Sequence, residues 1–156
     1  MCLVAKFLVS SLLVLIASRV CLAVDLNYTE IVVVTNETRF SRLHPDVELV
    51  AFKKERHVKG NFVFSSGERF SGDRLVLNFL DKTQFTRAED IEVELKYPAR
   101  NESGVILTFV EIFIDLTSQL ADTYFFGGGI DHSFADMLLV CNQTQHFTYQ
   151  IFMYGY

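Results

Sequence analysis

Residues 91–97 read Ile-Glu-Val-Glu-Leu-Lys-Tyr, so that every second side chain is apolar and the side chains between them are charged. Successive side chains of a β-strand point to opposite faces of the sheet. The stretch therefore predicts a strand with one face against a core and the other in water. We expect Glu92 and Glu94 to share the wet face as charges that aid solubility.

The same alternation recurs along the chain and predicts an all-β domain. Leu75, Leu77 and Phe79 fall on one predicted face, and a similar pattern occupies 47–51 and 147–153. Residues 105–116 are apolar on both faces over most of their length and predict a central strand. Short strands with turns between them are typical of an antiparallel β-sandwich or barrel, and we expect about seven to eight strands.

The amino-terminal residues 1–23 predict a helical signal peptide. Lys6 precedes an apolar run over 7–17, and Cys21-Leu22-Ala23 has the small residues of a cleavage site. The run is too short for a bilayer, which needs about 20 residues. We expect a secreted, extracellular protein with no membrane segment after cleavage, an N-terminal arm over 24–45 and an all-β domain over 46–156.

Four Asn-x-Ser/Thr sequons lie in or beside predicted turns, where a bulky glycan has room. We expect N-glycosylation, and the candidate acceptors are Asn27, Asn36, Asn101 and Asn142.

Charge and cysteine content restrict the partners and the covalent chemistry. The net charge is −5, and loss of Lys6 and Arg19 with the leader makes the remainder more acidic, which disfavours nucleic-acid binding. The basic residues of 53–59 are expected on a solvated edge strand, because lysine commonly blunts such edges. Cys141 is the one cysteine left after cleavage, so no intramolecular disulfide forms; we favour burial over a link between chains.

No residue pattern predicts an enzyme, a metal site or a cofactor. Asp131-His132-Ser133 has the residue types of a hydrolase triad, but adjacent residues of a strand point apart. The histidines lack zinc-site spacing. Gly127–Gly129 lacks the Lys-Ser/Thr of a phosphate loop, and we expect a positive-φ turn or a bulge there.

Phenylalanine is abundant, with 15 residues against no tryptophan. A packed core is the simpler explanation. The alternative is a cavity for a small apolar ligand, as some β-barrels have. Its expected lining residues are Phe62, Phe64, Phe79 and Phe109.

Four elements, in order, resemble the insect multiprotein bridging factor two family, whose members are also catalogued as probable salivary secreted peptides. The first element is Ser71-Gly72-Asp73-Arg74-Leu75-Val76, and the second is Leu95-Lys96-Tyr97-Pro98. The third is Gly127-Gly128-Gly129-Ile130, and the chain closes on Ile151-Phe152-Met153-Tyr154-Gly155. The resemblance covers about two-thirds of the chain, roughly residues 59–156. The matching residues are Gly72, Asp73, Leu75, Val76, Tyr97, Pro98, Gly127, Gly128, Gly129, Tyr154 and Gly155.

The resemblance implies two different functions. The family takes its name from a transcriptional co-activator that bridges a nuclear receptor to the general transcription machinery, yet its members commonly carry signal peptides. The leader and the sequons favour a secreted, non-enzymatic β-domain that binds a protein or a small apolar ligand outside the cell. The co-activator role and the role of an apolar-ligand carrier remain alternatives.

Overall fold

A computed structural model describes residues 29–34, 39–56, 61–99 and 103–156. Within these ranges eight strands form one open antiparallel sheet, together with one short helix. The elements are β1 Thr29–Val34, α1 Arg39–Leu43, β2 Val50–Ala51, β3 Lys53–Arg56, β4 Phe62–Gly67, β5 Arg74–Tyr97, β6 Leu107–Leu116, β7 Leu120–Gly128 and β8 Ala135–Gly155. The predicted antiparallel all-β fold is confirmed.

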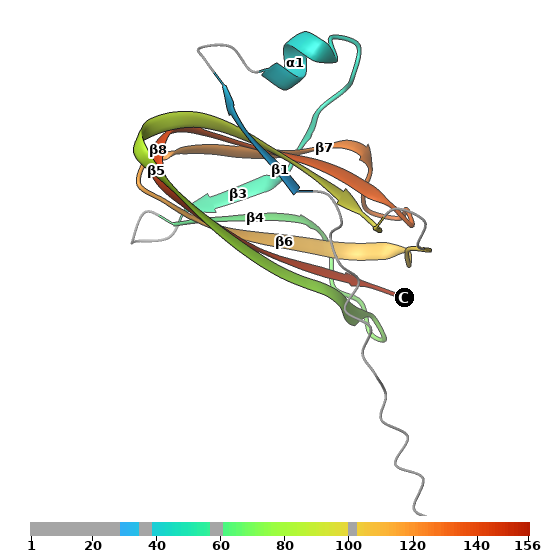
Figure 1. The fold of residues 1–156 in the computed structure, drawn as a ribbon. Helices are drawn as coiled ribbons and strands as arrows, with labels where there is room; N and C mark the ends of the chain where they lie inside the picture. The colour runs from blue at the N-terminus through green and yellow to red at the C-terminus, as the bar shows by residue number, and fades with distance from the viewer. Residues whose placement is uncertain (1–28, 35–38, 57–60, 100–102) are drawn as a thin grey trace, which may run out of the picture.

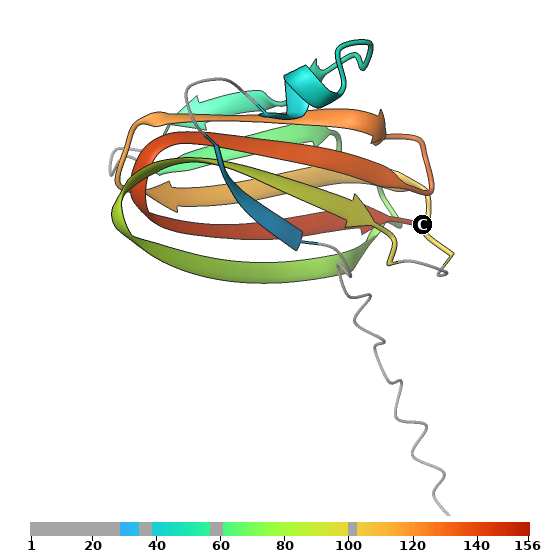
Figure 2. The same cartoon turned by 45° about the horizontal axis from the view of Figure 1, so that its top comes forward.

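The two long strands β5 and β8 bend, and the sheet folds back on itself into an upper and a lower layer (Figure 1). The first half of β5 pairs with the second half of β8, and this lower layer continues through β6, β4 and β3. The second half of β5, residues 89–97, pairs with the first half of β8, residues 135–144, and forms the upper layer. In that layer β1 lies beside β5 and β7 lies beside β8. Figure 2 shows both strands curving from one layer into the other.

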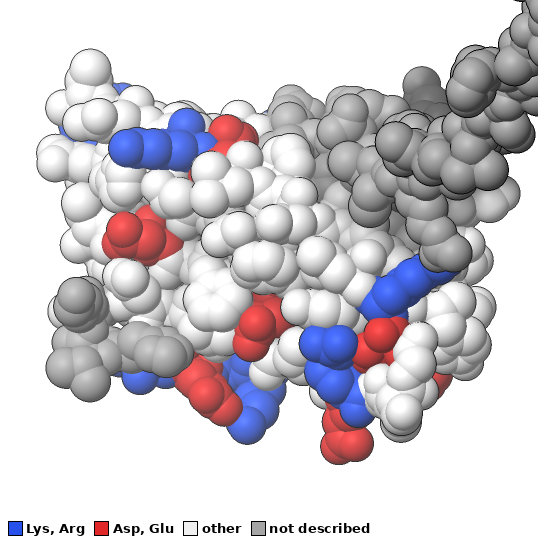
Figure 3. All heavy atoms as spheres, turned by 90° about the horizontal axis from the view of Figure 1, so that it is seen from below, with Lys and Arg blue, Asp and Glu red and all other residues white. Residues whose placement is uncertain are grey.

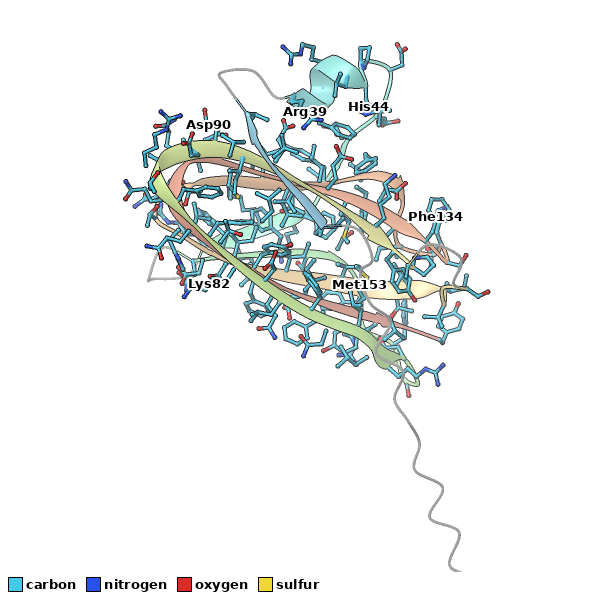
Figure 4. All side chains as sticks on the ribbon, viewed as in Figure 1. Arg39, His44, Lys82, Asp90, Phe134 and Met153 are labelled. Atoms are coloured by element: carbon cyan, nitrogen blue, oxygen red, sulfur yellow. The ribbon has the colours of Figure 1, made fainter. Side chains whose placement is uncertain are left out.

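The bend is made by irregular pairing and by polar side chains. The β5–β8 register shifts between Gln84 and Glu89, and Gln143 has a positive φ of 54°. Asp90 Oδ1 accepts a 2.8 Å hydrogen bond from the Gln143 backbone N–H, which ties the two strands together at the bend. Figure 4 shows Lys82 and Asp90 at this end of the molecule and Phe134 at the opposite end.

The hydrophobic core lies between the layers. Alternate residues of β5, β6, β7 and β8 enter it where the strand pairing is regular, as the fully buried Val93, Ile112 and Ile151 illustrate. Buried apolar area is the main favourable term in folding, at about 25 cal/mol per Å². The described residues therefore form a substantial core, in which the one cysteine, Cys141, is free.

The first part of the chain packs against the rest of the sheet. β1 pairs with residues 90–95 of β5, and α1 lies over the outer face of the upper layer (Figure 1). β2 pairs with β7 above and β3 with β4 below, so the stretch around Phe52 crosses from layer to layer. The β3 strand lies at the sheet edge with all its residues exposed, as predicted for the basic cluster over residues 53–56; residues 57–59 of that cluster lie outside the described ranges.

Candidate interaction surface

The residues that carry the family resemblance gather at one end of the sheet. Asp73 follows the turn at Gly72, whose φ is +98°. Its carboxylate accepts hydrogen bonds from the Arg69 guanidinium at 2.7–3.0 Å, from the Phe70 N–H at 3.1 Å and from the Thr108 hydroxyl at 3.0 Å. Arg69 chiefly, helped by the other two donors, lowers the pKa of Asp73 to about 2.

The other elements of the resemblance shape neighbouring loops. The Tyr97 hydroxyl accepts a 3.1 Å hydrogen bond from Val105 N–H. Gly128 and Gly129 have φ values of +59° and +108°, and the register shifts between Phe125 and Gly127, which confirms the predicted turn and bulge. A Cβ on Gly155 would collide with the Ile106 carbonyl oxygen. These residues thus position strand ends and do not converge on a reactive cluster.

The hydrolase-like triplet lies in the exposed turn before β8. His132 Nδ1 is 2.9 Å from the Ile130 carbonyl oxygen, and its ring meets Phe134 edge to face. No group of His, Cys, Asp and Glu residues suited to a metal occurs in the described part of the chain.

Asn142 is the one predicted glycan acceptor that falls within the described ranges. It is exposed at the bend of β8, opposite Leu120 of β7. Asn27, Asn36 and Asn101 lie outside the described residues, as does the predicted signal peptide at 1–23.

Cys141 is fully buried in the core, in agreement with the favoured prediction. Burial chiefly raises the pKa of its thiol, so the reactive thiolate form is disfavoured.

The predicted cavity lining is wrong at one position. Phe62 and Phe64 are 3% and 1% exposed in the core, and Phe79 packs against the same core. Phe109 lies on the opposite side of the sheet, where its ring centroid is 6.1 Å from that of Tyr154. The four rings therefore cannot line one internal cavity.

Leu75 also lies on the opposite face of the sheet from the one predicted. The β5–β8 register steps from Leu75 opposite Tyr154 to Leu77 opposite Met153, so Val76 is the extra residue of a β-bulge. A one-residue insertion reverses the side-chain alternation on one side of it. Leu77 consequently enters the core, while Leu75 stays 45% exposed on the outer face.

The outer face of the lower layer carries aromatic side chains that sequence alternation alone did not single out. Phe113 of β6 is 40% exposed and meets Phe152 of β8 edge to face at 5.8 Å. Phe109 and Tyr154 form a second cross-strand pair beside them. We call this surface the aromatic face; it comprises Leu75, Asn78 and Leu80 of β5, Phe109, Glu111, Phe113 and Asp115 of β6, and Thr148, Gln150, Phe152 and Tyr154 of β8.

The signal for this face was present in the sequence. Phe109 and Phe113 alternate with the core residues Val110 and Ile112, so β6 is apolar on both sides. Figure 3 views the molecule from below and shows uncharged atoms over much of this face, with acidic and basic side chains scattered among them.

Glu92 does not lie on a wet face, and that prediction is wrong. Glu92 is 3% exposed, because α1 lies over it. Its Oε2 accepts a 2.9 Å hydrogen bond from the N–H of Phe40 in α1. Phe40 is itself buried against the ring of Phe126 at 4.7 Å. Burial raises the pKa of Glu92, and its Oε1 has no hydrogen-bond partner among the described residues.

The fold and this surface together define an all-β domain, a single bent sheet whose outer faces differ in kind: one is covered by a helix and the other carries aromatic rings. Residues 66–155 match the family described as Transcription activator MBF2. The match covers more than half of the chain, and the protein belongs to that family.

The comparisons find no match to the chain among curated proteins or among solved structures. Within the described ranges, no helix is both long enough and apolar enough to cross a membrane.

Proposed function

We propose that this protein is a secreted, N-glycosylated, non-enzymatic domain that binds another protein through its aromatic face. The observation that carries the proposal is the exposure of Phe113, Leu80 and Leu75 together on one sheet surface, at 40%, 60% and 45%. Grouped exposed apolar side chains with polar neighbours are typical of interaction sites.

The shape of the surface favours a macromolecule as the partner. Small-molecule sites are concave and enclose most of their ligand. The aromatic face spans strands β5, β8 and β6, which lie about 4.8 Å apart, and a sheet contacts a ligand from one side only. Aromatic rings are enriched at the centres of protein–protein interfaces.

Export is supported by the leader pattern of residues 1–23 and by the exposure of Asn142. Expression of the full chain in insect cells tests it. We expect the medium to contain a chain that starts near residue 24 and loses mass on treatment with an N-glycosidase. An Asn142→Gln variant should lack one glycan. Retention of Met1 in an unmodified intracellular product would contradict export.

Site-specific photo-cross-linking tests the surface. A photo-reactive amino acid at Leu80 reports on the aromatic face, and the same group at Val50 is the control, since Val50 is 56% exposed on a strand of the upper layer. In the fluid into which the protein is exported, position 80 should give a discrete adduct with one protein, and position 50 should not.

Phe113→Ser should abolish that adduct without changing the melting temperature greatly, because the ring is already 40% exposed. Equal cross-linking from both positions, or an adduct insensitive to Phe113→Ser, would rule out the aromatic face as the binding surface.

A second function is favoured by the description of the family as a transcription activator. In that case the domain would bridge a nuclear receptor to the general transcription machinery. A leaderless chain fused to a DNA-binding domain should then activate a reporter gene, and Phe113→Ser should reduce the activation. A fusion that is present in the nucleus but inactive would exclude this role.

A further inference from the structure

Glu111 lies near the centre of the aromatic face. Along β6 it falls between Phe109 and Phe113, and across the sheet it is opposite Phe152 of β8 and Ser65 of β4. It is half-buried and makes no ion pair with any described residue. A carboxylate ringed by aromatic side chains would be costly to cover with an apolar partner, because its charge would lose water without compensation.

The chain itself shows how a cation is accommodated beside these rings. The Arg69 guanidinium carbon is 3.6 Å from the centroid of Tyr154, and the same guanidinium is paired with Asp73. The guanidinium therefore makes a cation–π contact with the ring while a carboxylate neutralises its charge. Arg69 pairs with Asp73 and lies over Tyr154 at the end of the face. It also attracts Glu111 electrostatically but forms no ion pair with it, so the carboxylate of Glu111 can accept a cation from a partner.

We propose that the aromatic face binds an extended protein segment in which a basic side chain lies between two apolar ones, with the basic group on Glu111. The proposal rests on the protein-binding function above and specifies the chemistry of the partner. Phe109, Glu111 and Phe113 present an apolar–acidic–apolar series at every second position of β6. A partner in strand conformation presents its own side chains with the same period of two, so an apolar–basic–apolar series matches it.

Charge distinguishes this partner from others. Asp115 adds a second carboxylate to the same face, and the whole chain has a net charge of −5. Lys82 lies on the same face, opposite Thr148, so two carboxylates stand against one cation among the side chains there that form no ion pair in the described chain. The excess of negative charge disfavours an anionic membrane surface or a nucleic acid. A basic segment is attracted to Glu111 and Asp115, and the exposed Leu80 and Phe113 on the same face offer it apolar contacts.

The test uses two fluorescent peptides and the full secreted chain. The first peptide has leucine, arginine and leucine alternating with serine; the second has citrulline, which is uncharged and nearly isosteric, in place of arginine. Fluorescence anisotropy should show the arginine peptide binding about tenfold more tightly, since a charge-assisted hydrogen bond contributes at least that factor.

Glu111→Gln should weaken the arginine peptide by about the same tenfold factor and leave the citrulline peptide unchanged. Glu48→Gln is the matched control, because it removes the same charge from an exposed position before β2 and should change neither affinity. Melting temperatures of both variants should equal that of the wild type.

Equal affinity of the two peptides, full retention of arginine-peptide binding by Glu111→Gln, or absence of binding by the arginine peptide would each overturn the inference. The cross-linking at Leu80 separates this failure from a failure of the proposed function. A discrete protein adduct at Leu80 without any peptide preference would leave the protein-binding face in place and remove only the basic partner.

Discussion

At the scale of single residues, Asp73 links the turn at Gly72 to β6. Its side chain is 1% exposed and accepts hydrogen bonds from Arg69, Phe70 and Thr108. All three donors stabilise the ionised carboxylate, which explains the lowered pKa. The motif residue is therefore a structural anchor that also holds Arg69 against Tyr154.

We expect the stability of the protein to depend on Asp73 at acid pH. Its ordinary pKa of 3.8 falls to about 2 in the folded state. The folded state therefore binds the proton less readily than the unfolded state, so this contribution is present above about pH 4 and is lost as the pH falls towards 2. Urea unfolding between pH 2 and 5 should show a falling midpoint.

Asp73→Asn should have a lower urea midpoint at pH 5 and a weaker decline below pH 4 than the wild type. Asp46→Asn, at an exposed position before β2, serves as the control and should retain the wild-type profile. If Asp73→Asn declines as steeply as the wild type, another carboxylate is responsible.

Glu92 leads to the opposite pH dependence. Burial beneath α1 raises its pKa, so the folded state takes up a proton more readily than the unfolded state. The favourable contribution is present below the ordinary carboxyl pKa of 4.5 and is lost as the pH rises through the folded-state value. Glu92→Gln keeps an oxygen that can accept the Phe40 N–H and carries no charge.

We therefore expect Glu92→Gln to raise the melting temperature at pH 7 by a few degrees and to change it little at pH 4. Differential scanning calorimetry at the two pH values measures this difference. Glu94→Gln, which removes the same charge from a less buried position on the same strand face, is the matched control. A lower melting temperature for Glu92→Gln at pH 7 would mean that the carboxylate is ionised and needed for holding α1.

At the scale of elements, close backbone approach sets the limits on substitution at the strand ends. Gly155 lies at the end of β8, where the Ile106 carbonyl oxygen and a Val105 methyl group occupy the space of a Cβ. Gly72 has a positive φ of 98° but no atom within 4 Å of the corresponding Cβ position. Substitution of Gly155 thus tests steric exclusion of a Cβ atom, whereas substitution of Gly72 tests only the backbone conformation.

Gly155→Ala should destabilise the protein more than Gly72→Ala. The turn variant suffers only the left-handed backbone penalty, about 1 kcal/mol, whereas the strand variant must displace the backbone of residue 106. Chemical denaturation of the two variants measures the difference. An equal loss of unfolding free energy in the two variants would indicate that residues 103–106 move aside at no cost.

At the scale of the whole molecule, the family match and the folded unit do not coincide. The match begins at residue 66, yet β4 begins at Phe62 and pairs with six residues of β6. Phe62 and Phe64 are core residues of that strand, and β3 continues the sheet beyond it. The matched region alone would leave the core open along β6.

We expect a fragment of residues 66–156 to fail to fold, while the chain from residue 24 folds cooperatively. Removing two buried phenylalanine side chains alone costs about 3–5 kcal/mol each, comparable to the whole stability of many domains. Dispersion of amide signals in NMR spectra distinguishes the two chains. A well-dispersed spectrum from the fragment would show that β3 and β4 are dispensable.

The alternation of apolar and polar residues was sufficient to predict the strand class and much of the core. Ile91, Val93, Leu95 and Tyr97 enter the core as the pattern of 91–97 predicts, because a strand faces its core with a period of two wherever the pairing is regular. The edge position of the basic strand and the burial of Cys141 also followed from local composition.

Long-range packing decided the rest. The bulge at Val76 exchanged the face of Leu75, and the docking of α1 buried Glu92, although neither event leaves a periodic trace in the sequence. Strand order brought Phe109 and Phe113 of β6 beside Tyr154 and Phe152 of β8 and so created the aromatic face. Local sequence determines which side chains lie together on a strand, whereas contacts between strands far apart in the chain determine which of those faces are covered and which remain open to a partner.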